Sequence, residues 1–377
     1  MYTRKFVPLM LAALLILGFF TVVIKPVSAD LIENSWNTKT SMNQARGGLG
    51  VVAVNGKVYA IGGIADGHVL VGTNEQYDPV SDTWVTLEPM PTPRAYFAIA
   101  VYQSNIYCIG GTSYNAKGEW DACAVNEIYD TLTNHWSTKM SFPSDEKWLH
   151  AQVVGEQIFV SKFPELFMYD PIEDTWSTKT SMPVYPASEP VWAVVGDKIM
   201  VTCRYLAGSP TVAQKVMIYD TKSDLWSERK TGPTLIDDGV KAGVTTGVYA
   251  PQRVYVFFGT LDTLVYDFIN DSWSSAQAMS IDRRRFGVAV VDDVLYVIGG
   301  FSQVSVPSAV NEQYVPVWYN AVPIDTEPSG SLVTSEPEPS KTPSTYLIAT
   351  ILTIIVVTFA TGLFLYFKKR NKKGDTT

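Results

Sequence analysis

The chain has 377 residues, of which 46% are hydrophobic and 12% aromatic, with 3 Cys and 3 His. This composition argues against a disordered chain, a coiled coil, a disulfide scaffold or a histidine-rich metal cluster, and nothing in it indicates a cofactor. The formal net charge is −8, but eight basic residues and one acidic residue lie near the two ends and leave a body with 21 basic and 36 acidic residues. A body this acidic repels phosphate backbones, which argues against nucleic-acid binding.

The N-terminal segment has the pattern of a secretory signal. Residues 6–24 are apolar and follow Arg4 and Lys5, and Val27 and Ala29 provide small residues before a cleavage site at Asp30. Residues 1–29 are therefore predicted to form a signal peptide. Because the apolar run is 19 residues long, an uncleaved signal anchor with the same topology is the alternative.

The C-terminal segment predicts a membrane anchor. Residues 347–367 carry no charge, and 21 residues in a helix are long enough to cross a hydrocarbon core of about 30 Å. We therefore expect a transmembrane helix at 346–367, with the basic tail 368–377 in the cytoplasm and the body outside the cell. Residues 321–345 are rich in Pro, Ser, Thr and Glu, cannot bury enough apolar area to fold, and are predicted to form a stalk.

The body between these ends contains an internal repeat. Five Tyr-Asp pairs, which begin at Tyr77, Tyr129, Tyr169, Tyr219 and Tyr266, each precede a tryptophan by seven positions. The five tryptophans are 52, 40, 50 and 47 residues apart, a period that is typical of four-stranded propeller blades. The Asp of each pair is expected to accept backbone N–H groups in the turn that follows it.

Each period also begins with an apolar strand, a polar turn and a second apolar strand. Six such turns, at 55–56, 103–105, 155–157, 196–197, 250–252 and 292–293, predict six blades. In three periods the second strand ends in a glycine doublet, at Gly62-Gly63, Gly110-Gly111 and Gly299-Gly300, where the missing Cβ permits positive φ. Together these features resemble the kelch repeat from about Asn34 to Tyr319.

The resemblance implies an all-β fold, a six-bladed kelch-type β-propeller over residues 30–320. The aromatic residues expected to pack between blades are Trp36, Trp84, Trp136, Trp176, Trp226 and Trp273. Tyr314 has no tryptophan seven positions later, whereas residues 36–42 (WNTKTSM) closely copy residues 176–182 (WSTKTSM). The N-terminal strand is therefore predicted to close the last blade, which removes exposed sheet edges.

The resemblance also implies a ligand face at the entries to the first strands and the loops after the second strands. The basic and aromatic residues expected there are Arg46, Arg94, Tyr114, Trp120, Lys147, Trp148, Arg204, Tyr205, Arg284 and Arg285. A basic cluster on an acidic body favours an acidic protein segment or an anionic glycan as the ligand. The alternative is that these arginines are solvated along the strand edges.

We therefore expect a cell-surface binding or adhesion module without catalytic residues or a bound metal. The alternative is a carbohydrate-active enzyme, such as a sialic-acid epimerase or a sialidase-like hydrolase, for which Glu189, Asp237 and Asp238 are the available carboxylates.

Two covalent modifications remain open from the sequence. Cys108 and Cys123 flank the loop of the second repeat and are candidates for a disulfide, with three buried thiols as the alternative. Asn270 begins the sequon Asn-Asp-Ser in a predicted exposed turn and is a candidate glycosylation site.

Overall fold

The computed structural model describes residues 31–184, 190–206, 212–229, 240–259, 263–302 and 305–320, with the backbone alone at 203–206 and 212–214. The chain divides into two compact units, 1–326 and 327–377, and every described residue belongs to the first. Within the described ranges no helix is long and apolar enough to span a membrane. The predicted signal (1–29), stalk (321–345), membrane helix (346–367) and tail (368–377) lie outside the described residues.

The described residues form six four-stranded antiparallel sheets, which we number in chain order. Sheet 1 contains β2 (Gly50–Val54), β3 (Lys57–Ile61), β6 (Asn74–Asp78) and β7 (Thr83–Leu87). Sheet 2 contains β9 (Ala98–Tyr102), β10 (Asn105–Ile109), β13 (Asn126–Asp130) and β14 (His135–Lys139). Sheet 3 contains β15 (His150–Val154), β16 (Gln157–Lys162), β17 (Glu165–Asp170) and β18 (Thr175–Lys179).

Sheets 4 to 6 repeat this arrangement. Sheet 4 contains β19 (Val191–Val195), β20 (Lys198–Leu206), β21 (Val212–Asp220) and β22 (Leu225–Arg229). Sheet 5 contains β23 (Lys241–Val244), β24 (Val254–Phe257), β25 (Thr263–Asp267) and β26 (Ser272–Ala276). Sheet 6 contains β27 (Gly287–Val291), β28 (Val294–Ile298), β29 (Asn311–Val315) and β1 (Ser35–Lys39). The short elements β4 (Ile64–Ala65), η1 (Asp66–His68), β5 (Val69–Leu70), β8 (Arg94–Ala95), β11 (Thr112–Tyr114) and β12 (Trp120–Ala122) lie in the connections.

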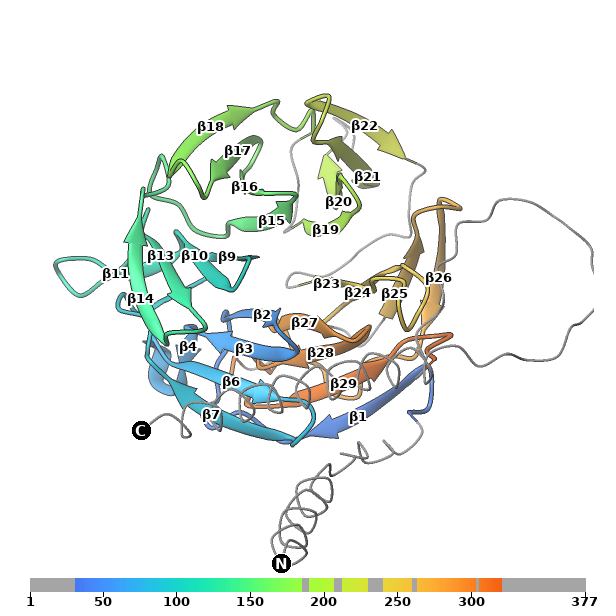
Figure 1. The fold of residues 1–377 in the computed structure, drawn as a ribbon, viewed down its shortest axis with the longest axis horizontal. Coiled ribbons are helices and arrows are strands. Elements are labelled where there is room, and N and C mark those ends of the chain that lie inside the picture. The colour runs from blue at the N-terminus through green and yellow to red at the C-terminus, as the bar shows by residue number, and fades with distance from the viewer. Residues whose placement is uncertain are drawn as a thin grey trace, which may run out of the picture. The chain divides into compact units, whose positions relative to one another are not determined.

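The sheets stand around a common centre, with the first strand of each sheet innermost (Figure 1). Tight turns join the first two strands, as at Asn55 and Gly56, whose φ values of 50° and 72° fit a hairpin turn. The N-terminal strand pairs with β29 as predicted, and Trp36 lies opposite Tyr314 just as Trp84 lies opposite Tyr77 in sheet 1. The described residues thus form an all-β, propeller-like fold in which the first strand, β1, and the last, β29, lie in the same sheet.

The hydrophobic core is divided among the contacts between neighbouring sheets. Each pair of adjacent sheets, including sheets 6 and 1, shares its own cluster of buried apolar side chains. Tyr77 of sheet 1, for example, is fully buried with its ring 5.8 Å from that of Tyr296 in sheet 6. Because aromatic burial is a large stabilising contribution, each sheet depends on both of its neighbours.

The repeated tyrosine and tryptophan differ in burial, which was not expected from the sequence. The six tyrosines are fully buried, whereas the six tryptophans are only half-buried. In five of them the indole Nε1 donates to a backbone carbonyl of the preceding sheet's outer edge; Trp84, for example, donates to Thr40 O at 2.7 Å. Five of these tyrosines are followed by an Asp that accepts N–H groups of its turn as predicted, as Asp78 does from Val80 at 2.9 Å. The sixth, Tyr314, is followed by Val315.

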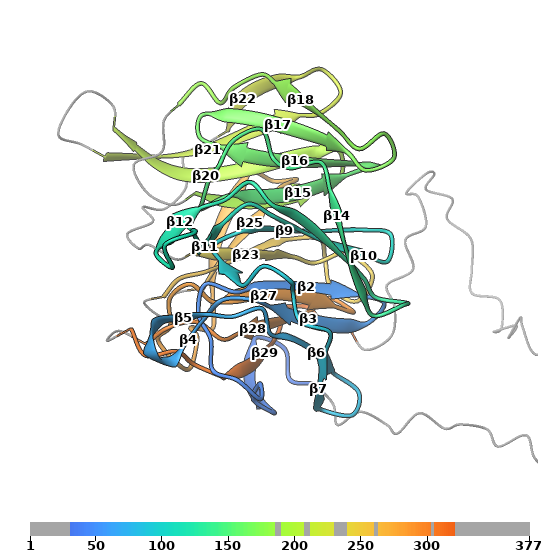
Figure 2. The same ribbon diagram turned by 90° about the vertical axis from the view of Figure 1, so that its left-hand side faces the viewer.

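The ring has two distinct faces. We call the side that holds the entries to the first strands and the loops after the second strands the entry face; β4, β5, β11 and β12 lie there, at the left of Figure 2. The opposite turn face holds the hairpin turns between the first two strands. The described ends meet at this second face, because Asn320 N donates to Tyr249 O at 2.7 Å and Trp318 N donates to Glu33 at 2.6 Å.

Candidate ligand-binding face and central cavity

The first two arginines expected at the ligand face are inside the protein. Arg46 and Arg94 have no exposed surface, and each forms an ion pair with a buried glutamate, Arg46 with Glu75 at 2.7 Å and Arg94 with Glu127. Arg283 repeats the arrangement with Glu312 in sheet 6. The expectation that Arg46 and Arg94 contact a ligand is therefore corrected: a buried guanidinium is kept inside by its paired carboxylate and is not available to a partner.

The buried arginines support the glycine doublets. Arg46 Nη1 donates to Gly62 O at 2.8 Å and to Thr73 O at 2.9 Å, the two ends of the loop that follows β3. Gly62 and Gly63 have φ values of 62° and 103°, as predicted for the doublet, and a Cβ on Gly63 would lie 2.9 Å from Gly47 O. In sheets 1, 2 and 6 the buried arginine therefore joins its glutamate partner to the backbone at or beside the glycine doublet.

Three side chains from three sheets form a cluster on the entry face. In each of these sheets the residue lies two positions before the first strand. Tyr96 and Trp148 stack with centroids 3.9 Å apart, and the Arg285 guanidinium lies 5.2 and 4.7 Å from the two rings. Arg285 Nη1 also donates to Tyr96 Oη at 2.8 Å. We call Tyr96, Trp148 and Arg285 the Arg285 cluster; cation–π contacts hold it together.

The backbone explains why these three side chains point outward. Tyr96, Trp148 and Arg285 have φ values of 55°, 61° and 55°, and Gly48 takes the same position in sheet 1 with φ 64°. Successive backbone bonds link the four, from Gly48 N to Arg285 O at 2.9 Å, from Tyr96 N to Gly48 O at 3.0 Å and from Trp148 N to Tyr96 O at 3.0 Å. The left-handed turn directs these side chains away from the sheet interfaces that hold Arg46 and Arg94.

The other expected ligand-face residues have separate places. Tyr114 and Trp120 lie opposite each other at the tip of the β11–β12 hairpin, and each is 42% exposed. Tyr114 Oη accepts the Leu70 N–H at 3.1 Å, which fixes this hairpin against β5. Lys147 and Arg284 are exposed beside the Arg285 cluster. The side chains of Arg204 and Tyr205, and the residues Glu189, Asp237 and Asp238, lie outside the described part of the chain.

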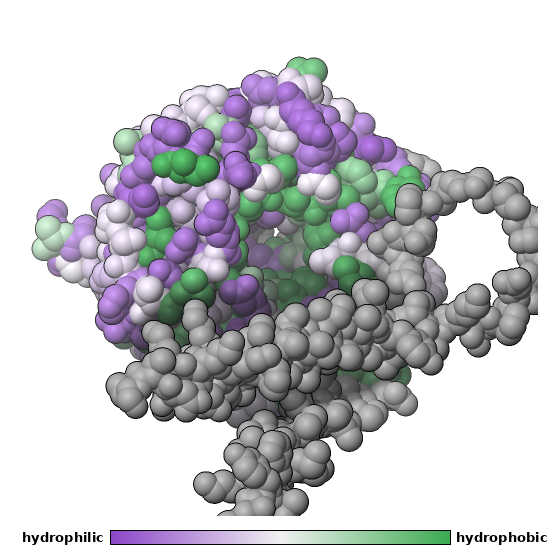
Figure 3. Space-filling model, in the orientation of Figure 1, coloured by the Kyte–Doolittle hydropathy of each residue, from purple (hydrophilic) through white to green (hydrophobic). Residues whose placement is uncertain are grey.

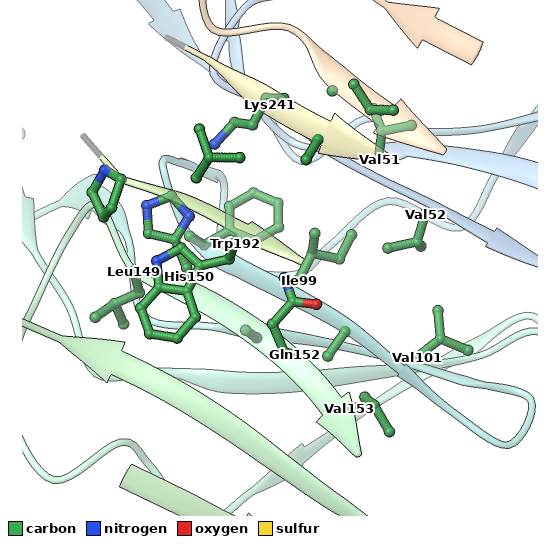
Figure 4. A pocket seen from close by; sticks show the side chains of 18 of the residues that line it. Val51, Val52, Ile99, Val101, Leu149, His150, Gln152, Val153, Trp192 and Lys241 are labelled. Atoms are coloured by element: carbon green, nitrogen blue, oxygen red, sulfur yellow. The ribbon is translucent and has the colours of Figure 1, made fainter. Parts of the chain in front are cut away.

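The first strands surround a central cavity. Its part nearer the entry face encloses about 330 Å³ and adjoins a second part of about 320 Å³. Figure 3 shows the central hollow with apolar side chains around it. His150, Gln152, Trp192 and Lys241 are its polar members (Figure 4). No three His, Cys, Asp or Glu side chains within the described ranges are grouped so that they could hold a metal ion.

The disulfide proposed between Cys108 and Cys123 is absent. Both cysteines are free thiols. Cys108 lies on β10 opposite Glu127, whereas the backbone of Cys123 forms an isolated β-bridge with Glu146, which precedes sheet 3. Burial raises the pKa of the Cys108 thiol to about 12. Asn270 lies in the exposed turn expected for it, and its Nδ2 donates to Asp267 Oδ2 at 2.7 Å.

Thiol accessibility tests this arrangement. In the native protein at pH 8, Cys108 is expected to react with a maleimide at least 100-fold more slowly than Cys123, since Cys108 is fully buried and a raised pKa leaves little thiolate. After denaturation without reductant, both should react fully in a mass-spectrometric assay. A peptide pair linked through the two cysteines would contradict the structure.

Comparisons with known proteins find kelch motifs and kelch-like relatives. The Kelch motif model matches residues 45–91, 93–143 and 282–317, the parts that hold the buried arginine–glutamate pairs. Kelch-like protein 35 of Mus musculus is 28% identical over 152 residues, which cover 40% of this chain and 26% of that protein. Kelch repeat and BTB domain-containing protein 8 of Homo sapiens is 30% identical over 182 residues, which cover 43% of this chain and 28% of that protein.

The chain thus spans about a quarter of the length of these relatives. The solved structure of YjhT superimposes with a TM-score of 0.59 at 15% identity, covering 72% of this chain and 95% of YjhT. That likeness concerns the fold alone. The repeated Tyr, Trp and glycine doublets, the three Kelch motif matches and the kelch-like relatives together support a kelch-repeat β-propeller family for this chain.

Proposed function

We propose that this chain is a non-enzymatic binding module, held outside the cell by one membrane helix, and that its entry face holds an acidic surface of a partner protein. The sequence supports the location through the apolar segment 6–24, the uncharged segment 347–367 and the basic residues after it. The described ends, at residues 31 and 320, meet at the turn face, on the side of the ring opposite the entry face.

The six sheets are proposed to be the six blades of one closed propeller. In support, each sheet shares a core cluster with both neighbours, and the N-terminal strand completes the sixth sheet. A closed ring leaves no free sheet edge and gives the loops on its face a rigid base. Such a base suits recognition, because loops that are already held in place lose little conformational entropy on binding.

The observation that carries the binding proposal is the set of exposed aromatic and basic side chains on one face. Tyr114 and Trp120 are each 42% exposed at a hairpin tip, and Lys147, Arg284 and Arg285 are exposed at the entries to the first strands of their sheets. Tryptophan, tyrosine and arginine are the residues enriched at the energetic centres of protein interfaces. Basic groups on an otherwise acidic body favour an acidic partner surface.

Cross-linking on intact cells tests this proposal. A membrane-impermeant lysine-reactive cross-linker should label Lys147 from outside and join it to a partner protein. The double variant Tyr114→Ala/Trp120→Ala is expected to reduce the cross-linked product at least tenfold. Trp318→Ala is the matched control, because Trp318 is 61% exposed but lies beside Glu33 on the turn face, and it should leave the product unchanged.

Three results would contradict the proposal. If Lys147 is not labelled on intact cells, the proposed location outside the cell is wrong. If the double variant gives the same amount of cross-linked product as the wild type, the entry face is not the binding surface. Binding of the purified chain to anionic glycans, lost in the double variant while no protein is captured, would assign the face to a carbohydrate ligand instead.

A further inference from the structure

The most exposed large apolar side chains among the described residues are distributed one to each sheet. The six with the largest exposed fractions, between 63% and 87%, are Ile32, Val80, Leu132, Ile172, Leu225 and Ile269. Five of them lie in the turn between the third and fourth strands of their sheet or at its end, and Ile32 lies just before β1 of sheet 6. Single exposed apolar residues are common, but six at comparable places around a ring form a repeated feature, which we call the apolar tips.

Strand direction places the apolar tips on the turn face. The third strand of a sheet runs parallel to the first, because both are antiparallel to the second, as β2 and β6 are to β3. It therefore ends on the side of the hairpin turns, opposite β4, β5, β11 and β12 (Figure 2). The described residues of the entry face expose their apolar side chains less, and the largest exposed fraction there is 55%, at Val306.

The backbone at the apolar tips is already hydrogen-bonded within each turn. In four of them the N–H of the exposed residue donates to the Asp two positions earlier, at 2.8 to 3.0 Å. Val80 N, for example, donates to Asp78 Oδ1 at 2.9 Å. An N–H group that is bonded inside its own turn loses no partner when water leaves, so these tips can enter an apolar medium at a low cost in free energy.

The spacing of the apolar tips favours a lipid surface over a folded partner. A protein interface is built around one contiguous core, whereas these side chains come from six sheets and are separated by polar turn residues such as Asp78 and Asp82. A bilayer interface accommodates each apolar side chain separately. The strength of such binding grows with the total apolar area that the face buries in the lipid.

The described C-terminal end lies on the same face as the apolar tips. Asn320 N donates to Tyr249 O, in the connection between the first two strands of sheet 5. The 25 residues 321–345 separate this point from the predicted membrane helix at 346–367. A chain of this length reaches at most about 80–90 Å when fully extended, so a helix inserted in the bilayer keeps the turn face at a high effective concentration near the lipid.

We propose that the turn face rests on a bilayer surface of zwitterionic lipids, with the apolar tips inserted among the headgroups. This inference rests on the proposed membrane anchor and deepens it, because it assigns the surface that contacts the lipid and directs the entry face away from it. Zwitterionic headgroups are favoured because aspartates flank the tips, as Asp78 and Asp82 flank Val80, and anionic headgroups repel them.

Photolabelling of the full chain tests the proposal, in phosphatidylcholine vesicles that contain a phosphatidylcholine with a diazirine near its headgroup. Mass spectrometry should find at least tenfold more lipid adduct on the turn peptides than on the entry-face peptide that contains Val306. The triple variant Val80→Ser/Ile172→Ser/Ile269→Ser should lower the adduct at the unaltered Leu132 tip at least fivefold, because fewer apolar side chains hold the face on the lipid.

Two controls accompany the triple variant. Val306→Ser, at an exposed apolar residue of the entry face, should leave every adduct unchanged. The triple variant should unfold at the wild-type temperature, because all three of its side chains are exposed. Vesicles with equal parts of phosphatidylserine and phosphatidylcholine should give less adduct on the turns than phosphatidylcholine alone.

Four results would overturn the proposal. They are turn adducts no larger than those at Val306, a wild-type adduct at Leu132 in the triple variant, adducts that increase with phosphatidylserine, and a dimer in sedimentation that the triple variant converts to a monomer. The last result would assign the face to a second copy of this chain. Adducts on residues 347–367 are measured separately: if these are present while the turns are unlabelled, the anchor stands and this inference fails, and in the reverse case the anchor alone fails.

Discussion

Arg46→Met is expected to lower the free energy of unfolding by about 3–5 kcal/mol, because it leaves the buried Glu75 carboxylate without its partner. It also removes the donors to Gly62 O and Thr73 O, which hold the loop after β3. Burial lowers the pKa of Arg46 below its ordinary value, and the Glu75 carboxylate offsets part of that shift. Thermal unfolding of the full chain should show a midpoint lower by about 5–10 °C.

Two further variants define the cause. Lys147→Met is the control at an exposed basic residue and should change stability by less than about 0.5 kcal/mol. The double variant Arg46→Met/Glu75→Leu should recover part of the loss, since it removes the uncompensated charge. If Arg46→Met unfolds at the wild-type temperature, or if the double variant is the sum of two large losses, the buried pair is not the source of stability.

The three buried ion pairs have a pattern in the sequence. Glutamate lies two residues before the repeat tyrosine in sheets 1, 2 and 6, whereas sheet 3 has Phe167 there and Glu146 in the arginine's place. Arginine, glutamate and glycine doublet are therefore present together or replaced together. The positions of Arg46 and Arg94 at strand entries were predicted, but their direction was not, because it depends on the left-handed turn two residues later.

The spacing of tyrosine and tryptophan predicted the strand order within each sheet because it repeats at a fixed register. In every sheet the two rings face each other across the third and fourth strands, as Tyr169 and Trp176 do with centroids 4.8 Å apart. The side chains that line the cavity were not predicted, because an innermost strand such as Val191–Val195 is uniformly apolar in sequence. Whether Trp192 faces a neighbouring sheet or the centre is decided only by how the sheets are assembled.

Deletion of residues 31–39 is expected to lower the free energy of unfolding on the order of 5 kcal/mol, the cost of removing a paired strand and a packed aromatic side chain. Strand β1 forms five residue pairs with β29, and Trp36 lies 5.5 Å from Phe257 in sheet 5. Asn34 also accepts Gln277 N–H at 2.8 Å, which joins sheets 5 and 6. The midpoint of thermal unfolding should fall by about 10 °C.

Addition of the missing strand in trans identifies the origin of this loss. A synthetic peptide of residues 30–42 should bind the truncated chain by adding a strand to the exposed edge of β29 and should restore most of the lost midpoint. The same peptide with Trp36→Ala should restore much less, because the indole packs on Phe257 and its Nε1 donates to Gln277 O at 2.9 Å. A truncated chain that melts at the wild-type temperature would show that the N-terminal strand does not stabilise the ring.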